Sequence, residues 1–199
     1  MLNHSTDPRI ILTLDTGGTN MVFGAMQRGE FIVEPLTLPA YADDLDLCLK
    51  TMVEGFRTII DQLDERPAAI SFAFPGPADY PNGIIGGQLL NFPAFRDGVA
   101  LGPYLKKKFS MPVYINNDGD LYAYGEEISK LASKVYDLDD PEELRQFIKG
   151  EQRQIKIYNS EIEVTYDPQK RIGIALSKIG ANKAVSLGAY AFALHQLSR

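Results

Sequence analysis

Two apolar runs separated by a short polar turn form the clearest pattern near the N-terminus. Ile10–Leu14 and Met21–Ala25 are rich in residues that favour strands, and Thr16-Gly17-Gly18-Thr19-Asn20 lies between them. This pattern predicts a β-hairpin with a glycine-rich tip. The segment from Glu30 to Leu38 alternates loosely between apolar and polar residues. It predicts a third strand that completes an antiparallel meander.

A helical period follows the meander. Between Asp43 and Leu63 apolar residues recur with the spacing of a helix that has one buried face. The short apolar run Pro67–Phe74 predicts a buried strand that ends at a proline-glycine turn. Asp97–Lys108 predicts a surface helix, and Pro112–Ile115 predicts another strand.

The C-terminal third of the chain predicts further elements. Apolar spacing favours one continuous helix from about Asp118 to Tyr136, and the Asp140-Pro141 pair favours a short helix after it. Ile155–Tyr158 and Ile162–Tyr166 predict a hairpin. The segment 184–197 is apolar over much of its helical surface, which indicates a helix buried by two neighbours.

Composition narrows the class of protein. The 199 residues are 45% hydrophobic and 23% charged, which is typical of a globular protein with a proper core. A net charge of −6 gives a nucleic acid no electrostatic attraction. The lone Cys48 excludes an internal disulfide framework and a multi-cysteine zinc site. The sequence contains no signal-peptide pattern and no long apolar span, so we expect a cytoplasmic protein without a membrane partner.

The tip of the N-terminal hairpin suits an anion. Gly17 and Gly18 have no side chains, so their backbone N–H groups can approach a phosphate closely. Asp15, at the end of the first strand, is placed to hold a divalent cation through water. Further hydroxyl and amide donors are offered by Thr16, Thr19 and Asn20. The alternative is a hairpin turn with no ligand.

Asp118 is a candidate catalytic carboxylate. It follows a predicted strand and opens a predicted helix, within the polar run Asn116-Asn117-Asp118-Gly119. A carboxylate within about 3 Å of a hydroxyl can accept its proton. On spacing alone, helix capping is the simpler role for Asp118, and turn formation explains Asn91 equally well.

Four strings in this order resemble the ROK family of sugar kinases and repressors, within the actin and hexokinase superfamily. They are LDTGGTN (14–20), ISFAFPGPAD (70–79), LLNFPAF (89–95) and PVYINNDGDLYAYGE (112–126). The resemblance covers residues 10–126. It implies an α/β fold: a ribonuclease H-like N-terminal lobe with a mixed five-stranded sheet flanked by helices, completed by a C-terminal helix. The implied domains are residues 1–126 and a C-terminal segment, residues 127–199, packed on them.

The resemblance also implies roles for individual residues. Asp118 would be the general base and Asn117 a sugar ligand, with Asn91 and Gly76 beside the sugar and Glu126 structural. The expected ligands are a hexose and ATP with Mg²⁺ at Asp15 through water, without zinc. The residues implied to bind the ATP phosphates are Asp15, Thr16, Gly17, Gly18, Thr19 and Asn20.

The chain departs from the family after residue 126. It contains no GTG-type second phosphate loop, no adenosine motif of the family and only two histidines, His4 and His195, so it resembles a ROK protein whose central part is missing. Since phosphoryl transfer depends on positioning and charge stabilisation, we expect an impaired kinase without measurable turnover.

Other functions stay open at this point. One alternative is a non-catalytic sugar-sensing or protein-interaction module of the repressor type. Only nine residues precede Ile10, so we expect no direct DNA binding; a homodimer is compatible with either function. Another branch of the superfamily, such as acetate-kinase-like or heat-shock-like ATPases, fits the Asn117-Asp118-Gly119 string less well.

Overall fold

The computed structural model describes residues 4–87, 89–121, 125, 153–156, 163–166 and 180–199. The chain divides into two compact units, residues 1–132 with 179–199 and residues 133–178. The expected domain boundary between residues 126 and 127 falls outside the described residues and stays a prediction.

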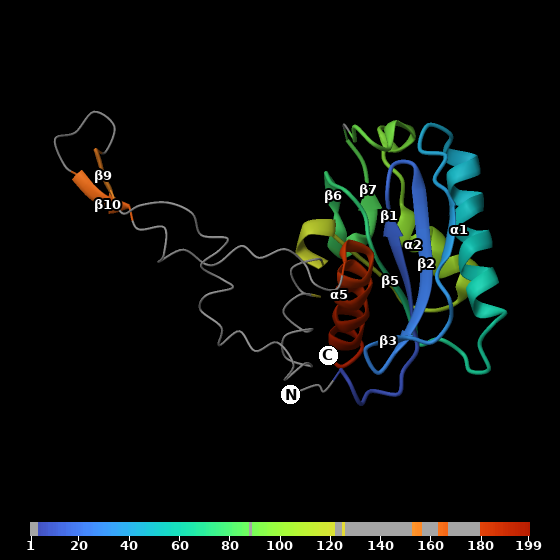
Figure 1. The fold of residues 1–199 in the computed structure, drawn as a ribbon. Helices are drawn as coiled ribbons and strands as arrows, with labels where there is room; N and C mark the ends of the chain where they lie inside the picture. Colours follow the sequence, from blue (N-terminus) through green and yellow to red (C-terminus); the bar gives the residue numbers. More distant parts are fainter. Residues whose placement is uncertain (1–3, 88, 122–124, 126–152, 157–162, 167–179) are drawn as a thin grey trace. The chain divides into compact units, whose positions relative to one another are not determined.

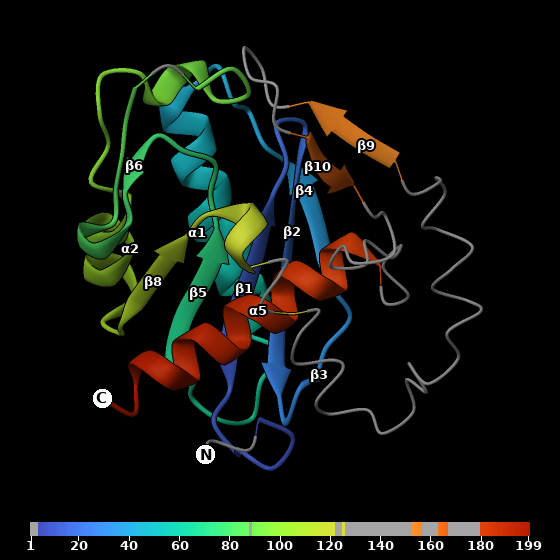
Figure 2. The same cartoon turned by 90° about the vertical axis from the view of Figure 1, so that its left-hand side faces the viewer.

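A mixed sheet forms the centre of the larger unit (Figures 1 and 2). Its strands are β1 (Ile11–Thr16), β2 (Asn20–Gln27), β3 (Glu30–Phe31), β4 (Leu36–Pro39), β5 (Ala69–Ala73) and β8 (Val113–Asn116). The order is β3-β2-β1-β5-β8, and β4 also pairs with β2. β1 is antiparallel to β2 and parallel to β5, which is parallel to β8. The α/β class and the mixed sheet are confirmed.

The sheet has six strands where five were expected, because the predicted strand Glu30–Leu38 is divided. β3 and β4 both pair with β2, β3 opposite Met26 and Gln27 and β4 opposite residues 20–23. Pro35, between them, has no backbone N–H to donate to a neighbouring strand. Two short strands therefore occupy the place of one along the edge of β2.

Two helices cover one face of the sheet. α1 (Leu45–Ile60) begins after Asp44, whose carboxylate accepts a hydrogen bond from the Leu47 N–H at 3.0 Å, so it is shorter at both ends than the predicted 43–63. α2 (Leu101–Phe109) starts later than the predicted Asp97, after Gly98 with its positive φ. Together they bury a core with many aromatic side chains against the sheet.

Cys48 lies in the buried face of α1. Burial raises the pKa of its thiol to about 12, and the charge of Asp44 adds to the shift. The thiol therefore stays protonated, and Cys48 is a core residue.

The opposite face is covered by α5 (Ala181–Gln196), which starts earlier than the predicted residue 184 (Figure 1). Its buried residues, among them Leu187, Tyr190 and Leu194, pack on Ile11, Met26 and Ala69 of the sheet. α5 also crosses a second helix, which begins at Asp118 and is described at residues 118–121 and 125. α5 therefore lies between two neighbours.

The crossing of these two helices is glycine to glycine. A Cβ on Gly188 would collide with the backbone carbonyl of Leu121, and a Cβ on Gly125 with that of Ala184. The backbones approach so closely only because both residues lack side chains.

Two two-stranded sheets complete the described structure. β6 (Ala78–Asp79) pairs with β7 (Ile84–Ile85) in the larger unit. In the smaller unit, β9 (Arg153–Lys156) pairs antiparallel with β10 (Glu163–Tyr166), which confirms the predicted hairpin.

Two predicted helical segments involve residues that the structure does not describe. The continuation of the Asp118 helix to residue 136 and the helix after Asp140 lie outside the described residues. No helix among the described residues has the length and apolar character needed to cross a bilayer.

Candidate functional site

The glycine-rich tip of the β1–β2 hairpin borders a cavity of about 440 Å³. The Gly17 N–H donates to the Asn20 carbonyl at 2.9 Å and closes the turn. The cavity is lined by Asp15, Gly17, Gly18, Thr19, Asn20, Val22, Thr37 and Asn182. All of the predicted phosphate-loop residues except Thr16 line it.

Thr16 has a different contact. Its hydroxyl donates to the carbonyl of Ala73 at 2.7 Å, which ties the end of β1 to the end of β5. The hydroxyl proton is used within the fold, so Thr16 positions the loop in this structure.

Asn91 lies directly against the phosphate loop. A Cβ built on Gly18 would be 3.0 Å from the Asn91 Cβ and 3.3 Å from its backbone oxygen. Gly18 therefore lets the segment before Pro93 approach the hairpin, and a larger residue would push the two apart. The structure brings together two motifs that are separated by about seventy residues.

Tyr80 links the proline-glycine turn to the Asn-Asp motif. Its hydroxyl donates to the Phe74 carbonyl at 2.9 Å and accepts from the Asn117 side-chain amide at 3.3 Å. The same hydroxyl lies 3.1 Å from the position of a Cβ on Gly76. Tyr80 thus places two of the predicted sugar-side residues, Gly76 and Asn117, beside each other.

Sequence reasoning did not identify Tyr80. Tyr80 lies next to the Asn82-Gly83 turn, in which Asp79 accepts a hydrogen bond from the Asn82 side chain at 2.7 Å. Nothing local in the sequence indicates which turn residue reaches the Asn-Asp motif.

Asn117, and not Asp118, takes the capping position of the helix. The Asn117 side-chain oxygen accepts from the Gly119 N–H at 2.9 Å, and its backbone carbonyl accepts the first helical bond from Leu121 at 3.0 Å. Asp118 is the first helical residue and is exposed; one of its oxygens also accepts from Gly119 at 3.0 Å. Within the described part of the chain, its second oxygen has no hydrogen-bond donor beside it.

The Asp15 carboxyl is partly buried and lies within the influence of the Asp118 charge. Burial raises the pKa of the Asp15 carboxyl above its usual range, and the negative charge of Asp118 raises it further. Burial also raises the pKa of Tyr80, the hydrogen bond from Asn117 opposes this, and the charges of Asp118 and Asp120 add to it. The ends of β1 and β8 therefore meet in one electrostatic environment.

The residues present fit a magnesium ion that is bound mainly by water and phosphate. Among the described residues, no cluster of three or more His, Cys, Asp or Glu side chains could hold a metal by itself. Mg²⁺ at nucleotide sites is commonly held by one or two carboxylates together with phosphates. Asp15, on the cavity wall beside Thr19 and Asn20, suits that arrangement.

Glu126 lies outside the described residues. The functional roles of Asp15, the loop residues, Gly76, Asn91, Asn117 and Asp118 stay predictions.

Several solved structures share this architecture. A glucokinase from Parabacteroides distasonis is 29% identical with a TM-score of 0.67, over 98% of this chain and 99% of its own. A ROK hexokinase from Thermus thermophilus is 24% identical with a TM-score of 0.52, over 59% of this chain and 38% of its own. A ROK family glucokinase from Streptomyces griseus, in complex with glucose and AMPPNP, is 14% identical with a TM-score of 0.53, over 63% of this chain and 38% of its own. No protein-family model and no curated protein sequence matches.

The architecture and these similarities define an α/β protein of the actin and hexokinase type. More narrowly, the chain has a ROK-like sugar kinase fold, so the resemblance stated from the sequence motifs is confirmed for the fold. It spans 38% of the length of the Thermus and Streptomyces proteins and almost all of the Parabacteroides chain. A chain of matching extent thus exists among solved structures.

Proposed function

We propose that this chain carries the phosphate-binding and base-supplying half of an ATP-dependent hexose kinase site. One observation carries the proposal: the ends of β1, β5 and β8 meet at one edge of the sheet. There the Thr16 hydroxyl donates to the Ala73 carbonyl, and Ala73 pairs with Asn116, next to the Asn-Asp motif. A hairpin turn with no ligand would need no such convergence.

Each motif has a distinct task in this proposal. The hairpin tip binds the phosphates of ATP, with Asp15 holding Mg²⁺ through water. Bound magnesium would neutralise negative charge on the phosphates. Asn91 and Asn117 hold hydroxyl groups of a hexose, and Tyr80 holds Asn117 in place.

The reaction is a transfer of the γ-phosphoryl group. The hexose hydroxyl oxygen bonds to the γ-phosphorus, the bond from that phosphorus to the bridging oxygen of ADP breaks, and ADP leaves. The hydroxyl proton passes to the carboxylate of Asp118, which is an exposed residue. The names of the similar solved proteins, sugar kinases among them, support this reaction class.

We further propose that the chain alone turns over slowly. Its sequence contains no second, GTG-type phosphate loop, so fewer donors can stabilise the charge that is transferred. The similar Parabacteroides chain, which is named a glucokinase, has nearly the same extent as this chain. Slow turnover is therefore the part of the proposal that an activity assay tests most severely.

The test is a calorimetric titration with Mg-AMPPNP and, separately, with glucose, mannose and N-acetylmannosamine, followed by an assay of ADP release. We expect both ligand classes to bind and ADP release to be close to the detection limit. Any release above the background should fall to the background in Asp118→Asn, while Asp120→Asn, which changes an exposed carboxylate in the same turn, should leave it unchanged.

The other outcomes separate the alternatives. If neither ligand class binds, the proposed function is wrong. Sugar binding without nucleotide binding would favour the non-catalytic sensing module. Rapid release that depends on Asp118 would overturn only the slow turnover.

A further inference from the structure

The cavity at the phosphate loop has a second wall, which comes from the C-terminal helix. Asn182, in the first turn of α5, lines the cavity together with Asp15 and the loop residues Gly17, Gly18 and Thr19. The sequence patterns gave α5 a packing role only. The structure therefore adds a polar side chain to the site from more than 160 residues downstream of the loop.

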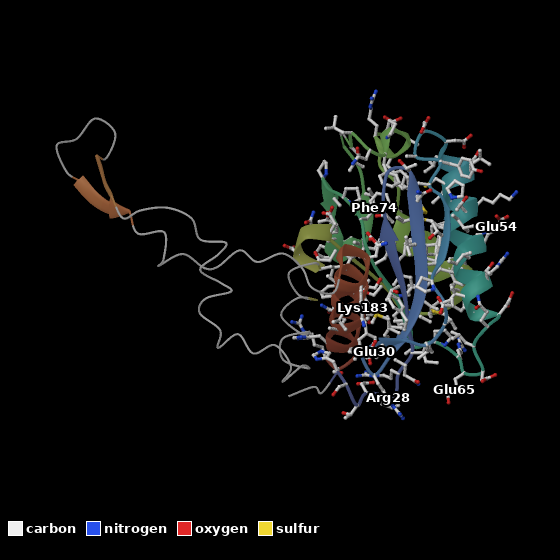
Figure 3. All side chains as sticks on the ribbon, viewed as in Figure 1. Arg28, Glu30, Glu54, Glu65, Phe74 and Lys183 are labelled. Atoms are coloured by element: carbon white, nitrogen blue, oxygen red, sulfur yellow. The ribbon has the colours of Figure 1, made fainter. Side chains whose placement is uncertain are left out.

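Contacts along α5 fix the position of the helix that carries Asn182. Tyr190, fully buried in the middle of the helix, accepts a hydrogen bond from the Arg28 N–H at 2.9 Å. The next residue, Lys183, turns toward the sheet edge and pairs with Glu30 at 3.0 Å (Figure 3). With Ala184 and the residues after it buried, Asn182 is left on the side of the helix that borders the cavity.

The Asn182 side chain has no other task within the described part of the chain. Gly180 occupies the capping position of α5, and no side chain caps the helix there. No hydrogen bond or ion pair of the Asn182 amide is found among the described residues. An amide that lines a polar cavity without a partner has two N–H donors available to a ligand.

The charge of the cavity selects among ligands. Asp15 is the single charged residue among the described residues that line it, and neither lysine nor arginine contributes. A bare phosphate would be repelled by the carboxylate, whereas a phosphate that carries a divalent cation would be attracted. A neutral amide can donate to that phosphate without repelling the cation.

We propose that Asn182 is a further ligand of the nucleotide, donating its side-chain amide to a phosphate oxygen in the cavity that it lines together with the glycine-rich loop. This inference rests on the proposed function, since it assigns one more contact to the same site. It makes the C-terminal helix part of the nucleotide site.

The test compares the whole chain with three variants by calorimetric titration with Mg-AMPPNP and with magnesium tripolyphosphate. Asn182→Ala and Asn182→Leu both remove the amide, and leucine keeps the side-chain volume. Each should weaken the binding of both ligands by about tenfold or more, as expected for the loss of a hydrogen bond to a charged group. Lys183→Ala, in the same turn but outside the cavity lining, should stay within about twofold of the unaltered chain.

Thermal unfolding of each variant separates binding from folding. The proposal requires midpoints for both Asn182 variants that match the unaltered chain. If both variants bind Mg-AMPPNP as tightly as the unaltered chain, the inference about Asn182 is wrong and the proposed function stands. If the unaltered chain binds neither ligand, both are overturned.

Discussion

The two faces of the central sheet are built in opposite ways. The face under α1 and α2 is filled with large side chains, including Phe23, Phe56 and Phe72. The face under α5 combines larger side chains such as Met26 and Tyr190 with many small residues, among them Ala69, Ser71, Ala73, Ala189 and Ala191. One face gains stability from apolar volume, and the other allows a helix to approach closely.

The candidate site belongs to the face with the small residues. Side chains alternate along β1, so Leu12 and Leu14 enter the aromatic core while Thr13 and Asp15 point to the side of α5. The helix that begins at Asp118 crosses α5 on the same side. The α1 face therefore supports the fold, while Asp15, Asn182 and the start of the Asp118 helix lie on the α5 side.

The largest effect is expected from removing aromatic volume on the α1 face. Phe56 is fully buried and packs against Phe23 and Phe109 with ring centroids 5.2 and 5.8 Å apart. Phe56→Ala should lower the free energy of unfolding by about 3–5 kcal/mol, measured by urea denaturation. Glu54→Ala, on the exposed side of the same helix (Figure 3), should change it by less than about 0.5 kcal/mol. Equal effects of the two substitutions would mean that α1 does not pack as described.

On the α5 face, added side-chain volume is expected to lower the free energy of unfolding. Gly188→Ala places a methyl group against the Leu121 carbonyl and should lower the free energy of unfolding by about 1–3 kcal/mol. His195→Ala, exposed on the same helix, serves as the control and should leave it within about 0.5 kcal/mol. A Gly188→Ala variant as stable as the unaltered chain would show that the helices do not cross at this point.

A smaller and opposite effect is expected at Thr13. Its hydroxyl is fully buried beside Ser71 in the register of β1 and β5, and neither hydroxyl has a hydrogen-bond partner within the described part of the chain. Thr13→Val keeps the shape and removes the unpaired hydroxyl, so it should raise the free energy of unfolding by about 1 kcal/mol. Thr58→Val, at an exposed position of α1, should give no such gain in the same denaturation experiment. A loss of stability in Thr13→Val would indicate a partner for that hydroxyl.

Local patterns predicted the elements better than they predicted the contacts between them. The hairpin, α1 and β5 follow from apolar periodicity and turn residues, which act over a few neighbouring positions. The division of the third strand could also have been predicted, because Pro35 has no backbone N–H with which to continue the pairing of a single strand. Tyr80 and Asn182 could not be found in this way, because each reaches the site only through tertiary packing.

The family resemblance supplied what the patterns could not. On spacing alone, Asp118 was better explained as a helix cap; the structure gives that position to Asn117 and leaves one oxygen of Asp118 open. The relation between Asp15 and Asp118 depends on which strands neighbour each other, and periodicity alone does not determine strand order.

The most direct test of the account is a measurement of the Asp15 pKa by carbon NMR in the unaltered chain, in Asp118→Asn and in Asp120→Asn. We predict a value above 3.8 in the unaltered chain, a lower one in Asp118→Asn and no change in Asp120→Asn. Because the folded state binds this proton more tightly than the unfolded state does, Asp15 stabilises the fold below about pH 3.8. That contribution should be lost as the pH rises through the folded-state pKa. An Asp15 pKa that is the same in all three proteins would contradict the claim that the phosphate hairpin and the Asn-Asp motif form one site.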